Sequence, residues 1–163
     1  MPTIGLKYFC EHKTKICYLV WTYMENLKYL VIGRDNMFCE SFTDKVIDHF
    51  MTPRNCGTMA DPDGEGSFGD PGCGDYLIIQ IKVKDNCIED IKFLVFGCTA
   101  AVASSSMTTV LAKGKTLEEA LMITDKDIAD ALDGLPVHKM HCSLLGASAL
   151  KNAIENYTSK LNT

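Results

Sequence analysis

The sequence predicts an α+β domain in which helices cover one face of a small antiparallel sheet. Between residues 76 and 96, two runs of alternating apolar and polar residues flank the pair Asp85-Asn86, a pattern typical of a hairpin. From Thr99 onward the apolar spacing becomes helical, and a hairpin followed by helices indicates segregated α and β parts. At 163 residues the chain is long enough for one domain with a substantial core.

The N-terminal residues do not share this organisation. Residues 1–36 show neither a strand nor a helix period that persists, whereas Met37 opens a stretch with clear patterns to the end. We therefore expect an atypical, dispensable extension over residues 1–36 and a folded domain over residues 37–163.

The first predicted helix begins at Ser41, whose hydroxyl would cap it with Asp44 three residues on. It ends before Pro53, because the residue before a proline is pushed out of the α region. Residues 54–75 contain six glycines and are predicted to be a loop, which at that length is usually functional.

Strands are predicted over residues 76–84 and 88–96, with Leu77 and Ile79 on the buried face of the first and Phe93 on that of the second. The paired ends of such a hairpin lie side by side. We therefore expect Cys73, just before the first strand, to lie near Cys98, just after the second.

Helices follow the hairpin. The first begins at Thr99 and ends at Gly114, a residue suited to the position after a helix. Two short helices are each predicted from a capping box, and a last helix runs from about residue 141 to 161. The two boxes pair Thr116 with Glu119 and Thr124 with Asp127.

Composition limits the functional classes. The net charge of −5 and the lack of a basic stripe argue against nucleic acid as a partner. The longest apolar runs are too short to span a membrane. Eight cysteines without a secretory leader favour metal or redox chemistry in a reducing compartment. We expect a cytoplasmic bacterial protein rather than a mitochondrial one, since a presequence should be arginine-rich and poor in acids.

The chemistry-bearing residues converge on one predicted metal site, made of Cys73, Asp75, Cys98, His141 and Cys142. The last two cysteines each fall at a predicted helix N-terminus, where the dipole and free N–H groups stabilise a thiolate. Three thiolates suit zinc or an iron–sulfur cluster. A carboxylate or imidazole as the fourth ligand is unusual for a cluster and favours a carrier over a permanent centre.

A lone cysteine is more often a small buried apolar residue than a ligand. We assign that role to the remaining five cysteines, Cys10, Cys17, Cys39, Cys56 and Cys87.

Several motifs together resemble the IscU/NifU-type iron–sulfur cluster assembly scaffolds. The resemblance covers about residues 41–160, in the same order and spacing. It rests on Gly72-Cys73-Gly74-Asp75, Phe96-Gly97-Cys98-Thr99-Ala100-Ala101, Gly114-Lys115-Thr116-Leu117 and Lys139-Met140-His141-Cys142-Ser143.

The resemblance implies a scaffold, not an enzyme, that builds a transient [2Fe–2S] cluster from iron and desulfurase-derived sulfur and passes it to apo-proteins. Cys73, Cys98 and Cys142 would be ligands, with Asp75 and His141 as exchangeable partners. Cys142 would accept persulfide sulfur from a cysteine desulfurase, ferredoxin would donate electrons, and zinc could occupy the same ligands. Whether a homodimer forms is left open.

One departure concerns residues 135–139, Leu-Pro-Val-His-Lys, which lack the paired prolines of the family's chaperone-recognised stretch and put a co-chaperone system in doubt. The alternatives are a zinc-dependent sulfurtransferase that relays persulfide sulfur and a structural zinc domain. The compact interval from Cys98 to Cys142 and the presence of Asp75 favour the scaffold.

Overall fold

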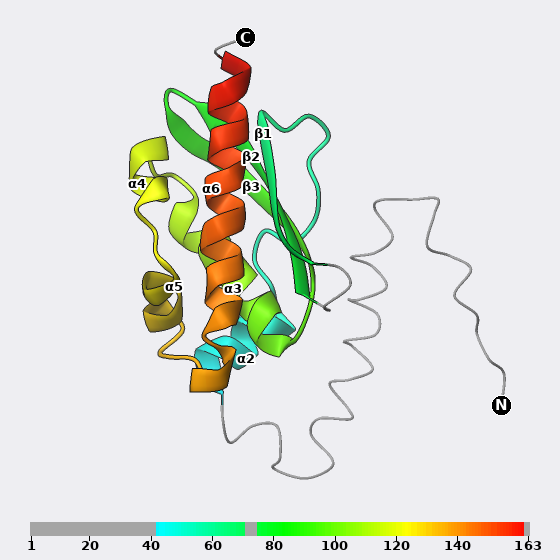
Figure 1. Ribbon diagram of the computed structural model, residues 1–163, viewed down its shortest axis with the longest axis vertical. Coiled ribbons are helices and arrows are strands. Elements are labelled where there is room, and N and C mark those ends of the chain that lie inside the picture. The colour runs from blue at the N-terminus through cyan, green and yellow to red at the C-terminus, as the bar shows by residue number, and fades with distance from the viewer. Residues whose placement is uncertain (1–41, 71–74, 162–163) are drawn as a thin grey trace, which may run out of the picture. The chain divides into compact units, whose positions relative to one another are not determined.

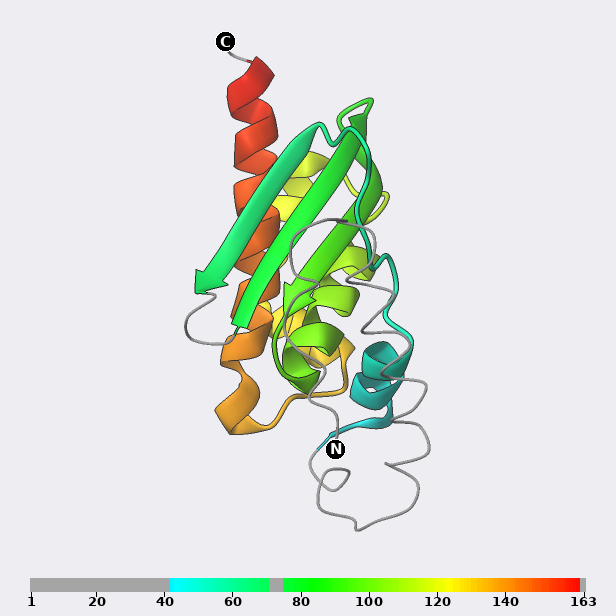
Figure 2. The ribbon, with the colours of Figure 1, turned by 90° about the vertical axis from the view of Figure 1, so that its right-hand side faces the viewer.

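A computed structural model describes residues 42–70 and 75–161, and the structural statements below concern these residues. They form a three-stranded antiparallel sheet in the order β1-β2-β3, with helices packed on one face (Figure 1). Figure 2 shows the sheet from its uncovered face, with α6 behind it. The α+β class predicted from the sequence is confirmed.

The strands are β1 (Gly64–Asp70), β2 (Asp75–Lys84) and β3 (Cys87–Phe96). The helices are α2 (Asp44–Met51), α3 (Thr99–Ala112), α4 (Leu117–Leu121), α5 (Asp125–Ala131), the short 3₁₀ helix η1 (Val137–Lys139) and α6 (His141–Leu161).

The β2–β3 hairpin follows the predicted pattern closely. Asp85 and Asn86 have φ of 50° and 61°, the left-handed values that a two-residue turn needs to match the twist of the strands. The apolar side chains Leu77, Ile79 and Ile81 are fully buried against the helices. The alternation in the sequence therefore identified both strands and the face that they bury.

Strand β1 corrects the prediction of a continuous loop over residues 54–75. Its glycines are not loop residues but sites of close approach by α6. A Cβ on Gly66 would lie 2.5 Å from the Ala149 carbonyl oxygen, and one on Gly64 would lie 2.9 Å from Tyr157 Cβ. Glycine in a strand marks such an approach by another backbone, which periodicity alone cannot reveal.

The outer edge of β1 is covered by two asparagine side chains of α6. The Glu65 backbone N–H donates to Asn156 Oδ1 at 3.1 Å, and Asn152 Nδ2 donates to the Ser67 carbonyl at 2.8 Å. These bonds satisfy main-chain groups of an edge strand that would otherwise be open for pairing.

Local capping explains several helix boundaries. Both predicted capping boxes are present, at Thr116 before α4 and at Thr124 before α5. Gly114, with φ of +82°, follows α3 as predicted.

The start of α2 corrects a prediction, because its N-cap is Thr43 rather than Ser41. Thr43 Oγ1 accepts the Val46 N–H at 3.2 Å and donates to the Leu132 carbonyl at 2.5 Å. This second bond is to a residue far along the chain, so local sequence could not indicate it. The helix ends at Met51, ahead of Pro53, as expected.

A buried hydrogen bond between His49 of α2 and Ser106 of α3 joins the two helices. His49 Nδ1 lies 2.8 Å from Ser106 Oγ, which also accepts the Arg54 backbone N–H at 2.8 Å. Burial, followed by the charge of Arg54, lowers the pKa of His49 from its ordinary 6.5. Ser106 is fully buried, so this pair is structural and is no accessible nucleophile with its base.

Helices α3 and α6 approach each other closely at Gly146. A Cβ there would overlap Thr108 Oγ1 and lie 3.1 Å from Thr108 Cβ. The small residue therefore sets the spacing of the two helices.

Within residues 42–70 and 75–161, no helix combines the length and apolar character needed to cross a membrane. The extension expected over residues 1–36 lies outside the described residues and stays a prediction.

Candidate metal centre

Three chain segments meet at one end of the sheet, where Figure 2 shows β2 and α6 both beginning. Asp75 is the first residue of β2, and Cys98 is the N-cap residue of α3, directly after β3. His141 and Cys142 are the first two residues of α6. The hairpin and the two helix starts therefore gather four of the five predicted ligands.

The ligand atoms lie at close range. The two sulfurs of Cys98 and Cys142 are 3.6 Å apart, and Cys142 Sγ is 3.5 Å from His141 Nε2. His141 Nε2 is in turn 3.9 Å from Asp75 Oδ2. The ligand atoms of Asp75, His141 and Cys142 all lie within 4.8 Å of one another.

Two of these spacings are those expected between neighbouring ligands of a tetrahedral ion. Metal–sulfur bonds of about 2.3 Å place two sulfurs roughly 3.8 Å apart, and a sulfur and an imidazole nitrogen roughly 3.6 Å apart. The Cys98–Cys142 and Cys142–His141 distances fall close to these values. The 3.9 Å between His141 and Asp75 exceeds the roughly 3.3 Å expected between nitrogen and oxygen ligands. The carboxylate is therefore the donor that would have to move inward.

Asp75 is held by the backbone at the start of α3. Its Oδ1 accepts the Cys98 N–H at 3.3 Å, at a helix start whose own N-cap side chain makes no capping bond. Gly97 makes this approach possible, since a Cβ there would lie 2.7 Å from Asp75 Oδ1. Periodicity alone gives Gly97 no role, although a glycine directly before a candidate ligand is a signal of close packing.

The contact between the two thiols favours negative charge on Cys98 over Cys142. The hydrogen bond with Cys142 lowers the pKa of Cys98 to about 5, aided by the N–H groups of Ala101 and Ala100 and the charge of Lys139. The same bond, burial and the negative charges of Cys98 and Asp75 raise the pKa of Cys142. The sequence predicts a stabilised thiolate at both residues, since both lie at predicted helix starts. A helix N-terminus is available to both residues, but the contact between the two sulfurs decides between them.

Accessibility also differs between the two cysteines. Cys142 is fully buried and belongs to the hydrophobic core, whereas Cys98 is partly exposed. The His141 side chain is 61% exposed. The site therefore opens to solvent through Cys98 and His141, with the Cys142 sulfur beneath them.

Cys73 lies outside the described residues, so its place in the site stays a prediction. In the sequence it stands three residues after Asp70 and two before Asp75. Asp70 and Asp75 pair with each other across the ends of β1 and β2.

The expectation that Cys56 and Cys87 are buried apolar residues is wrong. Cys56 is exposed, and Cys87 is only partly buried. The other three cysteines with that expectation, Cys10, Cys17 and Cys39, lie outside the described residues.

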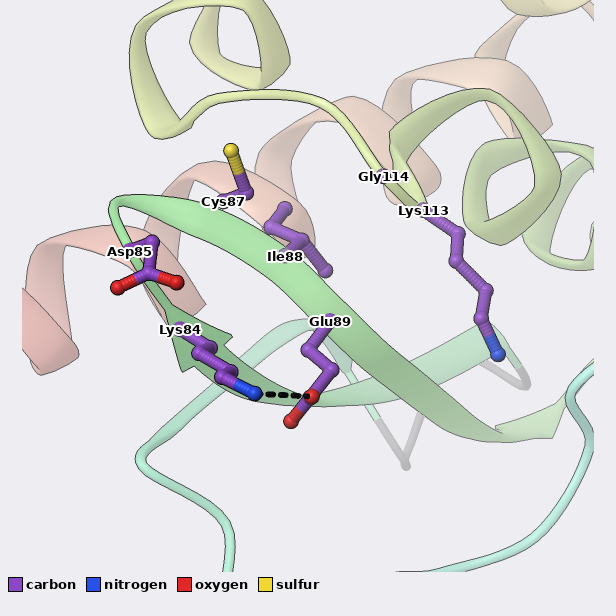
Figure 3. Close-up of a pocket in the computed structure, with 7 residues that line it drawn as sticks. All are labelled: Lys84, Asp85, Cys87, Ile88, Glu89, Lys113 and Gly114. Atoms are coloured by element: carbon purple, nitrogen blue, oxygen red, sulfur yellow. Dashed lines mark ion pairs between the residues drawn. The ribbon is translucent and has the colours of Figure 1, made fainter.

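A second hollow lies at the opposite end of the hairpin, beside the Asp85-Asn86 turn (Figure 3). Its volume is about 440 Å³, and two of its lining residues, Lys84 and Glu89, form an ion pair of 3.7 Å. Cys87 is the one thiol among its lining residues, which include no histidine. This hollow therefore lacks the converging donors found at the other end.

Fold and site together define a class: an α+β domain carrying thiolate, imidazole and carboxylate donors where a sheet meets two helix starts. Residues 41–163 match the family model described as the NifU-like N terminal domain. The chain belongs to this family.

Relatives within the family carry informative names. The iron-sulfur cluster assembly scaffold protein IscU 1 of Archaeoglobus fulgidus is 60% identical over 119 residues, covering 73% of this chain and 78% of its own. IscU of Escherichia coli K12 is 48% identical over 124 residues, covering 74% and 96%. A crystal structure of the N-terminal part of a nitrogen-fixing NifU-like protein from Brucella abortus shares the fold. Its TM-score is 0.57 at 18% identity, covering 72% of this chain and 94% of that one.

Proposed function

We propose that this protein is a scaffold on which an iron–sulfur cluster of the [2Fe–2S] type is assembled and then passed to apo-proteins. The observation that carries the proposal is the meeting of the Asp75, His141 and Cys142 ligand atoms within 4.8 Å of one another, with Cys98 Sγ 3.6 Å from Cys142 Sγ. Family membership and the relatives' names support the same role. The cluster is cargo in this proposal, so weak and exchangeable binding is an advantage.

Each proposed ligand has a distinct part. Cys73, Cys98 and Cys142 supply thiolates to iron. Asp75 and His141 are oxygen and nitrogen donors that bind iron less firmly and keep the cluster transferable. The Asp75 carboxylate accepts a hydrogen bond from the Cys98 N–H, and this hydrogen bond competes with binding of the carboxylate to metal.

The partners follow from this chemistry. A cysteine desulfurase supplies sulfur as a persulfide, which Cys142 finally holds, and a ferredoxin supplies electrons. Apo iron–sulfur proteins take the finished cluster. In isolated protein, zinc competes for the same thiolate and imidazole donors.

The test is anaerobic reconstitution of the full chain with ferrous iron, cysteine and a desulfurase. The expected result is a visible cluster spectrum that disappears as an apo-ferredoxin becomes coloured. Cys142→Ser should lose most of the cluster, whereas Cys87→Ser, which changes a thiol at the opposite end of the hairpin, should not. A colourless protein that holds only zinc would contradict the proposal and favour a zinc-dependent sulfurtransferase.

A further inference from the structure

The two sulfurs of the site differ in access while lying almost in contact. Cys98 is partly exposed at the start of α3, and Cys142 is fully buried at the start of α6. Their 3.6 Å separation means that an extra sulfur bonded to Cys98 Sγ, about 2.05 Å away, can come within contact distance of Cys142 Sγ. A sulfur atom that arrives from another protein therefore meets Cys98 first.

We infer that Cys98 is a second catalytic residue, an entry thiol that takes the sulfur from the persulfide donor and hands it to Cys142. This inference rests on the proposed function, because it requires that the protein accept persulfide sulfur. It adds an ordered relay between two residues to a site otherwise described only as a set of ligands.

The first step is an exchange between the donor and Cys98. The Cys98 thiolate attacks the outer sulfur of the donor's persulfide, and a sulfur–sulfur bond forms on Cys98. The donor's own sulfur–sulfur bond breaks, and its cysteine leaves as a thiolate that takes up the proton of the outer sulfur, so the new persulfide on Cys98 is an anion.

In the second step the Cys142 thiol transfers its proton to that outer sulfur, and Cys142 Sγ then attacks the same atom. The bond to Cys98 breaks, Cys98 leaves as a thiolate, and Cys142 carries the persulfide. One neutral sulfur atom moves between three thiols, the pair keeps one proton and one negative charge, and neither oxidant nor reductant is consumed.

The surroundings favour this direction. Cys98 lies at the N-cap of α3, where free N–H groups stabilise a departing thiolate, and it is partly exposed, whereas Cys142 is fully buried. The lack of exposed surface at Cys142 then shields the persulfide there from thiols in solution.

The experiment is a rapid-quench time course with metal-free full-length protein and a desulfurase charged with one equivalent of cysteine. Alkylation at each time point, followed by peptide mass spectrometry, locates the persulfide. In the unmodified protein the persulfide on Cys98 should rise first and decline as that on Cys142 grows. This order needs no variant, so it is free of any folding defect.

Two variants sharpen the test. Cys142→Ser should retain the persulfide on Cys98, and Cys98→Ser should load Cys142 about 100-fold more slowly, the typical cost of losing a positioned reacting group. Cys87→Ser is the matched control for a partly exposed thiol elsewhere and should load at the normal rate.

The outcomes separate the two ideas. If Cys98→Ser loads Cys142 at the normal rate, or if Cys142→Ser carries no persulfide on Cys98, the relay is refuted while the scaffold proposal stands. If the unmodified protein takes up no sulfur at either residue, sulfur acceptance itself fails, and the relay fails with it.

Discussion

Glycine at position 146 is predicted to give a more stable protein than alanine, because a Cβ there would meet the hydroxyl of Thr108. The substitution Gly146→Ala tests this. The added Cβ would overlap Thr108 Oγ1, and Thr108 is fully buried. Thr108 can relieve the overlap only by turning this oxygen away, which breaks its 2.7 Å bond to the Ser104 carbonyl. The substitution therefore converts a packing conflict into a lost buried hydrogen bond.

The size of the effect can be estimated from two opposing contributions. A buried hydrogen-bonding group left without its partner costs about 1–3 kcal/mol. Alanine in place of glycine inside a helix returns about 1 kcal/mol. In the full sequence Gly146→Ala should therefore lower the free energy of unfolding by about 1 kcal/mol. In a Thr108→Ala background the hydroxyl is already gone, so the same change should stabilise by up to about 1 kcal/mol.

The assay is urea unfolding of the four proteins of this double-mutant cycle, monitored by circular dichroism. The expected coupling between the two positions is about 2 kcal/mol, well above the roughly 0.3–0.5 kcal/mol within which independent sites add. If Gly146→Ala had the same effect in both backgrounds, the close approach of α3 and α6 at this point would not be the reason for the glycine.

Three further predictions concern the site and the buried histidine. Asp75→Ala should give a cluster that persists longer during transfer to apo-ferredoxin, since the labile oxygen donor is gone; an unchanged lifetime would remove that role. In metal-free protein, alkylation of Cys98 by iodoacetamide should be nearly independent of pH above about 6 and should fall as pH drops through about 5, because its pKa is lowered to about 5; a rate that climbs up to pH 9, as for an ordinary thiol, would disprove this. The lowered pKa of His49 means that the unfolded chain takes up a proton before the folded one, so stability should decline as pH falls below 6.5. His49→Gln should flatten this dependence in unfolding experiments, and an equally steep profile in the variant would assign the decline to other groups.

The sequence was informative where structure depends on near neighbours. The β2–β3 hairpin, both capping boxes and the start of α6 at His141 follow from alternation, turn residues and local hydrogen bonds. The proximity of Cys98 to Asp75 was also predictable, because the hairpin register places the residues just beyond Tyr76 and Phe96 side by side.

The sequence was uninformative where structure depends on distant packing. Glycines at positions 64 and 66 read as loop residues because nothing nearby indicates that α6 lies against them. Helix starts predict a stabilised thiolate at both Cys98 and Cys142, and the 3.6 Å contact that distinguishes the two residues cannot be deduced from an interval of 44 residues. Which of two adjacent thiols is ionised is a property of the pair.

The amides of Asn152 and Asn156 along β1 bear on how copies of this chain behave at high concentration. A second molecule could extend the sheet at this edge only by displacing both side chains, and the amides it freed would need new partners. The structure thus discourages fibre-like stacking on the one strand whose four glycine and serine positions leave it little side-chain bulk for protection. Replacing the two asparagines would leave an edge strand open for pairing with another copy of the chain. That would be a liability in a scaffold protein, which must bind other proteins briefly and release them.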